Sequence, residues 1–287
     1  MEQRHLQLGY HLVAFLDVLG QRERFRELKQ PKTAEESIAV AEVLRQTAGF
    51  VLDLRRIYGE QFQSFEAGLT YIKKETNAVI LPRFVGFSDS FVTSVPLHNQ
   101  GGELVPIITV FSALAAAAIV MLTSLASRHS LRGGIDVGLA TEIGPQEIYG
   151  TALERAYLLE SREAESPRIL IGDELWRYLE VALANFEMQT GPATKAITGI
   201  VKRIMELTAI DSDGKRILDY LGPIVVEHAA PGNSTAVNMV WPAYQFVLEE
   251  QKRISQCGDS KLAARYQALR SYFESRLPLW NLDRKKT

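Results

Sequence analysis

Short apolar runs that end at glycine, proline or acidic residues indicate a chain in which strands alternate with helices. Residues 11–16 form such a run, which ends at Asp17 and predicts a buried strand leading into a loop. Apolar positions at helical spacing, preceded by a capping box of Thr33 and Glu36, predict an amphipathic helix over 33–54. Two β-rich runs, 78–81 and 91–95, then predict a hairpin with Asp89 near its turn.

The stretch from 104 to 127 contains no charged residue and is long enough to cross about 30 Å of hydrocarbon as a helix. It is rich in alanine and also carries threonine and serine hydroxyls, so its hydrophobicity is modest for a membrane span. A helix that is apolar on all sides either spans a membrane or lies inside a protein. We therefore expect this helix to be buried in the core or at a subunit interface, with no membrane span.

The second half of the chain continues the alternation of strands and helices. Strands are predicted at 133–140, 169–172 and 216–221, and helices at 151–164 and 174–185, the latter with Asp173 as N-cap. Pro223 and Pro231 indicate a loop, and apolar spacing over 234–277 predicts two further helices. The segment 192–208 gives no clear pattern. Mixed strands and helices indicate an α+β or α/β sheet, which we divide into a domain at 8–222 and a C-terminal helical extension at 223–287.

Composition narrows the class of protein. The chain is 46% hydrophobic and 23% charged, which is typical of a globular protein. Its 32 basic and 34 acidic residues give a net charge of −2, which argues against sequence-independent nucleic-acid binding. Cys257 is the single cysteine, and no signal peptide opens the chain. We expect a cytoplasmic protein with no nucleic-acid partner.

Asp17 and Asp89 are the two acids whose positions differ most from ordinary surface residues. Each follows or joins apolar strands, and no lysine or arginine lies next to Asp89 in sequence. A buried carboxylate needs a proton, a cation or a metal, and a divalent ion between two carboxylates would also attract phosphate oxygens. Mg²⁺ with a nucleoside triphosphate fits this chemistry. The alternative interpretation is that both residues only stabilise turns.

Four blocks in order resemble the catalytic domain of class III nucleotide cyclases. They are residues 15–20 (Phe-Leu-Asp-Val-Leu-Gly), 86–90 (Gly-Phe-Ser-Asp-Ser), 132–138 (Arg-Gly-Gly-Ile-Asp-Val-Gly) and 149–156 (Tyr-Gly-Thr-Ala-Leu-Glu-Arg-Ala). The resemblance implies an α+β fold, an α/β sandwich with a mostly antiparallel central sheet flanked by helices. It also implies two Mn²⁺ or Mg²⁺ ions per site, held by Asp17, Asp89 and the backbone carbonyl of Val18. The substrate triphosphate would lie near Phe15, Val18, Leu19 and Gly20.

Several positions differ from the purine cyclases of that family. Val85 stands where those enzymes carry a base-reading lysine, and Glu147 stands at the position of a base-reading aspartate. Glu154 and Leu158 replace the asparagine and arginine that act in the transition state. Arg155 and Arg132 are the nearest arginines that could stabilise the transition-state charge on phosphorus in their place. The alternative for Arg155 is an exposed charge on a helix.

Within the family, the sequence looks most like the pyrimidine cyclases of bacterial anti-phage Pycsar systems. That resemblance implies conversion of UTP, favoured over CTP, to the 3′,5′-cyclic monophosphate and pyrophosphate, with a separate downstream effector that reads the product. It further implies a head-to-tail homodimer with composite sites at the interface. A purine cyclase and a catalytically inactive cyclase-like nucleotide sensor are the alternatives.

Overall fold

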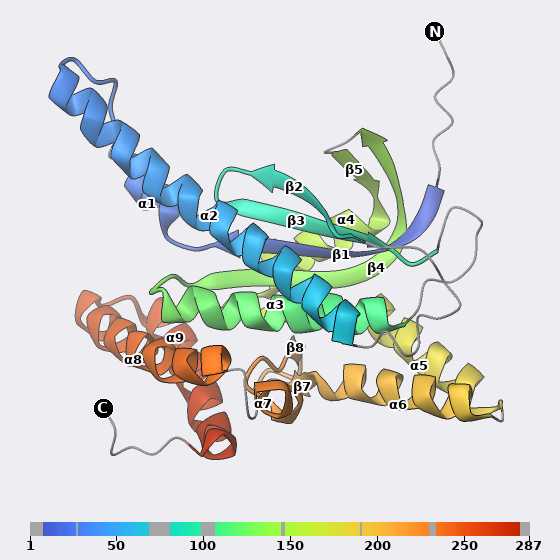
Figure 1. Cartoon of the computed structure of the whole chain (residues 1–287). Helices are drawn as coiled ribbons and strands as arrows, with labels where there is room; N and C mark the ends of the chain where they lie inside the picture. Colours follow the sequence, from blue (N-terminus) through green and yellow to red (C-terminus); the bar gives the residue numbers. More distant parts are fainter. Residues whose placement is uncertain are drawn as a thin grey trace, which may run out of the picture.

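The computed structural model describes residues 8–26, 28–68, 81–98, 107–144, 147–189, 191–229 and 234–281. An eight-stranded sheet runs through these residues in the order β2-β3-β1-β4-β6-β8-β7, with β5 paired to β4 (Figure 1). Its strands are β1 Leu8–Val18, β2 Arg83–Phe87, β3 Ser90–Pro96, β4 Leu131–Gly144, β5 Glu147–Gly150, β6 Ile169–Ile171, β7 Thr208–Ile210 and β8 Arg216–Leu218. All pairs are antiparallel except β4 with β6. The predicted α+β fold with a mostly antiparallel sheet is confirmed.

Helices flank this sheet on both faces (Figure 1). They are α1 Gln21–Arg26, α2 Ala34–Gly68, α3 Ile108–Ala126, α4 Thr151–Leu158 continued by a π turn at Leu159–Glu163, α5 Asp173–Glu187, α6 Pro192–Glu206, α7 Pro223–Ala229, α8 Ser234–Cys257 and α9 Ser260–Arg276, followed by a 3₁₀ turn at Leu277–Trp280. The alternation of β1 separates the two faces: Leu12, Ala14 and Leu16 join the main core, while Val13 and Phe15 join a smaller cluster with α4.

Helix α3 is the centre of the main core. All of its residues except Ile119 and Ala126 are buried, under α2 on one side and α8 on another. Among the described residues, it is the one helix long and apolar enough to cross a membrane, and here the protein itself covers it. The prediction that this helix is buried is therefore confirmed, and residues 104–106 of the predicted stretch lie outside the described residues.

Two glycines of β4 allow α4 to approach the sheet closely. A Cβ added to Gly134 would lie 2.4 Å from the carbonyl oxygen of Ala156, and one added to Gly138 would lie 2.8 Å from Oγ1 of Thr151. Because any other residue carries a Cβ, α4 could not occupy this position over a strand without glycine at these two places. The glycines thus set the position of α4 relative to β1 and β4.

The C-terminal helices are attached to the core by buried polar contacts. Asp219 is 3% exposed and accepts hydrogen bonds from the Tyr272 hydroxyl at 2.8 Å and from Arg276 Nε at 3.0 Å. The indole N–H of Trp280 donates to the carbonyl of Leu221 at 3.0 Å. These contacts bind α9 and the turn after it to the segment that follows β8, and residues of α8 and α9 belong to the main core.

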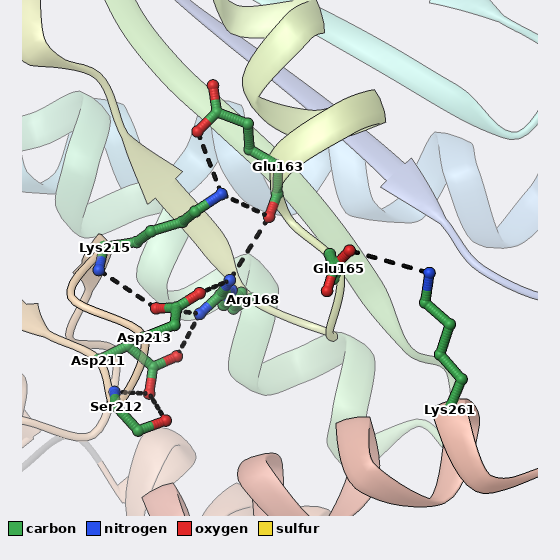
Figure 2. A network of polar contacts seen from close by, with 8 residues as sticks. All are labelled: Glu163, Glu165, Arg168, Asp211, Ser212, Asp213, Lys215 and Lys261. Carbon is green, nitrogen blue, oxygen red and sulfur yellow. Dashed lines mark hydrogen bonds and ion pairs between the residues drawn. The ribbon is translucent and has the colours of Figure 1, made fainter.

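A second polar network fixes the turn between β7 and β8 (Figure 2). Arg168 donates to Asp211 at 2.5 Å and to Asp213 at 2.6 Å, and Lys215 pairs with Glu163 at 3.2 Å. Arg168 is 8% exposed, so its charge is largely removed from water and needs both carboxylates. The network joins the sheet edge to the π turn that follows α4.

Several predicted boundaries were wrong. The first hairpin strand is β2 at Arg83–Phe87, in the segment that we assigned to the connection, and 78–80 lie outside the described residues. Helix α2 continues to Gly68 instead of ending near residue 54, because Tyr58 and Phe62 give its second half buried positions. One half of its predicted capping box is confirmed, because Thr33 Oγ1 accepts from the Glu36 N–H at 3.2 Å, while the Glu36 carboxylate accepts from the N–H of Lys32 at 2.6 Å.

Two further predictions need correction, and one segment without a predicted structure can now be described. Gly172 is the N-cap of α5 and Asp173 is its first residue. A Cβ at position 172 would lie 2.2 Å from the carboxylate carbon of Asp136, so the position requires glycine. The segment without a clear pattern forms α6 and β7. The region after Pro223 is helix α7 and not a loop, since proline is well suited to the first turn of a helix.

Candidate active site

Asp17 lies near the end of β1, on the face that carries α4. Strand alternation places it with Val13 and Phe15, as expected, and it is 9% exposed. In the register of the sheet, Asp17 lies between Ser90 of β3 and Arg132 of β4. The Arg132 guanidinium comes within 3.9 Å of the Asp17 carboxylate, so this charge is partly compensated from the neighbouring strand.

Asp89 occupies the two-residue turn between β2 and β3, next to Ser90. The preceding residue, Ser88, has a φ of 45°, in the left-handed region that favours glycine. The N–H of Val18 donates to the carbonyl oxygen of Asp89 at 3.1 Å, which fixes the turn to the end of β1. Asp89 is 7% exposed. The fold thus brings the backbones of Asp17 and Asp89 together, 72 residues apart in sequence (89 − 17).

The chemistry of this pair fits a hard divalent cation. Two carboxylates and nearby backbone carbonyls supply oxygen ligands only, which suit Mg²⁺ or Mn²⁺ better than softer metals. Within the described ranges, no three His, Cys, Asp or Glu side chains form a metal-binding group. Mg²⁺ is commonly held by one or two carboxylates together with water and substrate phosphates, so two protein carboxylates are enough for that mode of binding.

Arg132 is held in place by a residue that the sequence analysis did not identify. Glu160, in the π turn after α4, is 3% exposed and accepts from Arg132 Nε at 2.7 Å and from Nη2 at 2.5 Å. Since Glu160 belongs to a charged stretch, Glu-Ser-Arg-Glu-Ala-Glu, it reads as a surface residue in sequence. Its burial results from the π turn and the close approach of α4, neither of which the sequence pattern indicates.

Arg155 lies elsewhere on the same face. Its Nη1 donates to the carbonyl of Val137 at 3.1 Å, five residues further along β4 than Arg132, which corresponds to about 16 Å at the rise of a strand. Beside it, Asp136 is 4% exposed and accepts from the N–H groups of Val137 and Leu175. Burial raises the pKa of Asp136, while those N–H groups and Arg155 act in the opposite direction. Arg155 and Asp17 of one chain therefore do not form a common site.

The remaining predicted residues surround Asp17. The Phe15 ring packs edge-on against Tyr157 at a centroid distance of 5.4 Å. Leu19 donates its N–H to the carbonyl of Ser130 at 2.8 Å, so this amide and that of Val18 are both engaged within the chain. Gly20 is exposed and has a φ of 86°. Among Val18, Leu19 and Gly20, only the Gly20 N–H makes no backbone hydrogen bond within the described residues.

Val85 and Glu147, the two positions compared with base-reading residues in the sequence analysis, have different surroundings. Val85 is half-buried and packs against the cluster of Val13, Phe15 and Val92, whereas Glu147 is exposed on β5. On α4, Glu154 is exposed and Leu158 lines an open cleft of about 500 Å³ that also contains Asp136 and Arg155. Of these four side chains, Val85 therefore packs in the same cluster as Phe15, two residues before Asp17 on β1, whereas Leu158 lies in the cleft with Arg155.

No protein-family model matches the sequence, and no curated protein matches it. Among solved structures, the catalytic core of a rhodopsin-guanylyl cyclase with converted specificity, in complex with ATPαS, aligns at 12% identity over 61% of this chain and 84% of that chain, with a TM-score of 0.36. Two structures of a bacterial light-regulated adenylyl cyclase align at 12% and 13% identity over 71% of this chain and 59% of theirs, with TM-scores of 0.38 and 0.32. At these TM-scores, the likeness carries no information on the substrate or activity of this chain.

Proposed function

We propose that this chain is a metal-dependent nucleotide cyclase that converts UTP, or with lower preference CTP, to the 3′,5′-cyclic monophosphate and pyrophosphate. The main support is the pair Asp17 and Asp89, two carboxylates below 10% exposure whose backbones meet at one end of the sheet. Burying both as anions without a cation would be strongly unfavourable. Among the described residues no cationic side chain pairs with Asp89, so a purely structural role for the pair leaves that cost without compensation there.

The chain's own residues would then have separate tasks. When bound, two Mg²⁺ or Mn²⁺ ions would lower the pKa of the ribose 3′-hydroxyl and offset charge on the leaving pyrophosphate. Asp17, Asp89 and the Val18 carbonyl hold the ions in this proposal. Arg132, oriented by Glu160, presents a planar donor group at the same strand end, where it can bind phosphate oxygens.

A homodimer with composite sites is part of the proposal. Arg155 is about 16 Å along β4 from Arg132, so it can serve an Asp17 site only from another subunit. The outer end of the sheet also presents an apolar surface: Leu8, Leu139 and Tyr149 are exposed by 64%, 49% and 71%. In the sheet, Leu8 of β1 and Tyr149 of β5 both pair with Thr141 of β4, from opposite sides. Their side chains therefore lie on the same face of the sheet. A second copy of the chain is the occupant that composite sites require.

The pyrimidine preference follows from the residue at position 85. A lysine there could read a purine base, but Val85 is apolar and half-buried against Phe15 and Val92. The resemblance to Pycsar cyclases extends this preference to UTP over CTP, to a role in anti-phage defence in the cytoplasm, and to an effector that responds to the product.

The test is to incubate the purified protein with each of the four ribonucleoside triphosphates and Mn²⁺ and to identify the products by mass spectrometry. We expect cyclic UMP, with less cyclic CMP, and loss of the product in Asp17→Asn and Asp89→Asn. Asp53→Asn is the matched control, because Asp53 is an exposed aspartate paired only with Arg56 at 3.4 Å. Cyclic AMP or cyclic GMP alone would refute the pyrimidine assignment. Absence of any product would favour the nucleotide sensor.

A further inference from the structure

A cavity of about 460 Å³ opens beside the proposed active site, and it reaches residues that the cyclase proposal has not used. It lies between the loop after β1, the start of β4, and the C-terminal helices α8 and α9. Leu19, Gly20 and Arg132 line one side, and Arg253 and Arg265 line the other. Its volume is in the range of small-molecule binding sites.

Two donors that line the cavity have no partner in the described residues. Gln21 is 3% exposed, and its side-chain Nε2 is buried without a hydrogen bond. Arg265, half-buried on α9, has a buried Nε without a hydrogen bond. Buried donors are normally satisfied, because an unpaired one costs about 1–3 kcal/mol. Both groups donate only, so the partner that they lack is an acceptor.

The other charges around the cavity are already paired. Arg253 binds Glu250 at 2.7 Å, and Arg128 pairs with Glu249 at 2.5 Å. The second acid on the lining, Glu165, lies 3.9 Å from Lys261. Arg132 binds Glu160 and lies within 3.9 Å of Asp17, so one arginine joins the cavity to the proposed metal carboxylate. Among the described residues of this lining, the hydrogen-bond donors without a partner are those of Gln21 and Arg265, and they suit an anion with many oxygen acceptors.

We infer that this cavity binds the terminal phosphates of a polyphosphate, with Arg265 of α9 and Gln21 as binding residues. The inference rests on the proposed function, since its ligand is either the β- and γ-phosphates of the substrate or the pyrophosphate product. Phosphate oxygens accept bonds from both side chains, and guanidinium groups match phosphate geometry. The C-terminal helices thereby become part of the nucleotide site.

The first experiment measures binding of inorganic pyrophosphate to the full chain by calorimetry, without added metal. We expect wild type to bind and Arg265→Gln to bind about tenfold or more weakly, which is the loss typical of a charged hydrogen bond. Gln21→Leu, which removes the amide donor at nearly constant volume, should weaken binding by a smaller factor. Arg270→Gln is the matched control, because Arg270 is on the same helix but outside the cavity and binds Glu274. Unchanged pyrophosphate affinity in both cavity variants, or no binding by wild type, would overturn the inference.

A competition arm distinguishes the two sources of the phosphates. If the cavity holds substrate phosphates, UTP should displace pyrophosphate while uridine should not, and Arg265→Gln should raise KM for UTP far more than it lowers kcat. If UTP does not compete, the polyphosphate site is separate from the substrate, and the link to the cyclase site is refuted. The two proposals can fail separately. If the wild type makes no cyclic product but binds pyrophosphate, and Arg265→Gln weakens that binding, the proposed function is refuted and the cavity site is supported.

Discussion

Gly134 is the position where a single methyl group tests most directly how α4 is held over the sheet. An ideal Cβ there would lie 2.4 Å from the Ala156 carbonyl oxygen, 2.5 Å from Leu159 Cβ and 3.0 Å from the Glu160 nitrogen, whereas ordinary contact begins near 3.4 Å. Two of these three atoms are backbone, so rotation of a side chain cannot relieve the overlap. In Gly134→Ala, α4 has to move away from β4 by about 1 Å (3.4 − 2.4).

Overpacking of this kind costs about 1–3 kcal/mol. At roughly 2–4 °C per kcal/mol for a chain of this size, the melting temperature of Gly134→Ala should fall by about 2–12 °C. Turnover should fall as well, because α4 leads into the turn that carries Glu160, and Glu160 orients Arg132. Circular dichroism melts and the mass-spectrometric cyclase assay measure the two effects.

Gly199→Ala provides the matched control. Gly199 is exposed within α6, and a Cβ there would meet no atom within 4 Å. Alanine should therefore stabilise the protein, by up to about 1 kcal/mol, through its higher helix propensity. A melting temperature of Gly134→Ala equal to or above that of wild type would refute the packing of α4 on the glycines of β4.

Three further predictions concern buried polar groups. Asp219→Ala should destabilise the protein by about 3–5 kcal/mol in urea unfolding, because it leaves Arg276 without its carboxylate. The control Glu227→Ala removes an exposed pair with Arg203 and should cost less than about 1 kcal/mol. Equal effects of the two variants would contradict the burial of Asp219. Burial lowers the pKa of His11 from 6.5 to about 4, so below pH 6.5 the unfolded chain binds a proton that the folded chain refuses, and stability should fall between pH 6.5 and 4 by up to about 3 kcal/mol. The variant His11→Gln should lack this component, and an identical pH profile would exclude it. Glu160→Gln should keep the side-chain volume but weaken the ion pair with Arg132. Turnover should then drop about tenfold or more, with little change in the Kd for the metal. Unchanged turnover would show that Arg132 does not need Glu160 for its orientation.

The sequence analysis singled out the two acids of the candidate site because strand ends and turns leave a strong local pattern. Asp17 follows an apolar run, and Asp89 lies in the two-residue turn of a hairpin. Their approach in space comes from the pairing of β1 with β3, which are separated in the chain by α1, α2 and β2, so the local pattern alone does not determine it. The buried helix α3 was likewise predictable from its composition.

Contacts that depend on tertiary packing were not predictable in the same way. The π turn buries Glu160, whose neighbours in sequence are charged, and the cavity joins Gln21 to Arg265, 244 residues later (265 − 21). Helix α6 follows a segment of glycine, threonine and proline that weakened its pattern. In each case the deciding interaction is between elements far apart in the chain, to which local periodicity is insensitive.

The burial of α3 under α8 has a consequence for synthesis on the ribosome. Translation from the end of α3 at residue 126 to the start of α8 at residue 234 adds 108 residues, which takes about 5–20 s. During that time the helix already has the length and composition of a membrane segment, and α2 can cover one of its sides, but the side that α8 covers stays exposed. Until α8 and α9 emerge, the nascent chain therefore exposes an apolar surface, and we expect a chain that ends before α8 to aggregate.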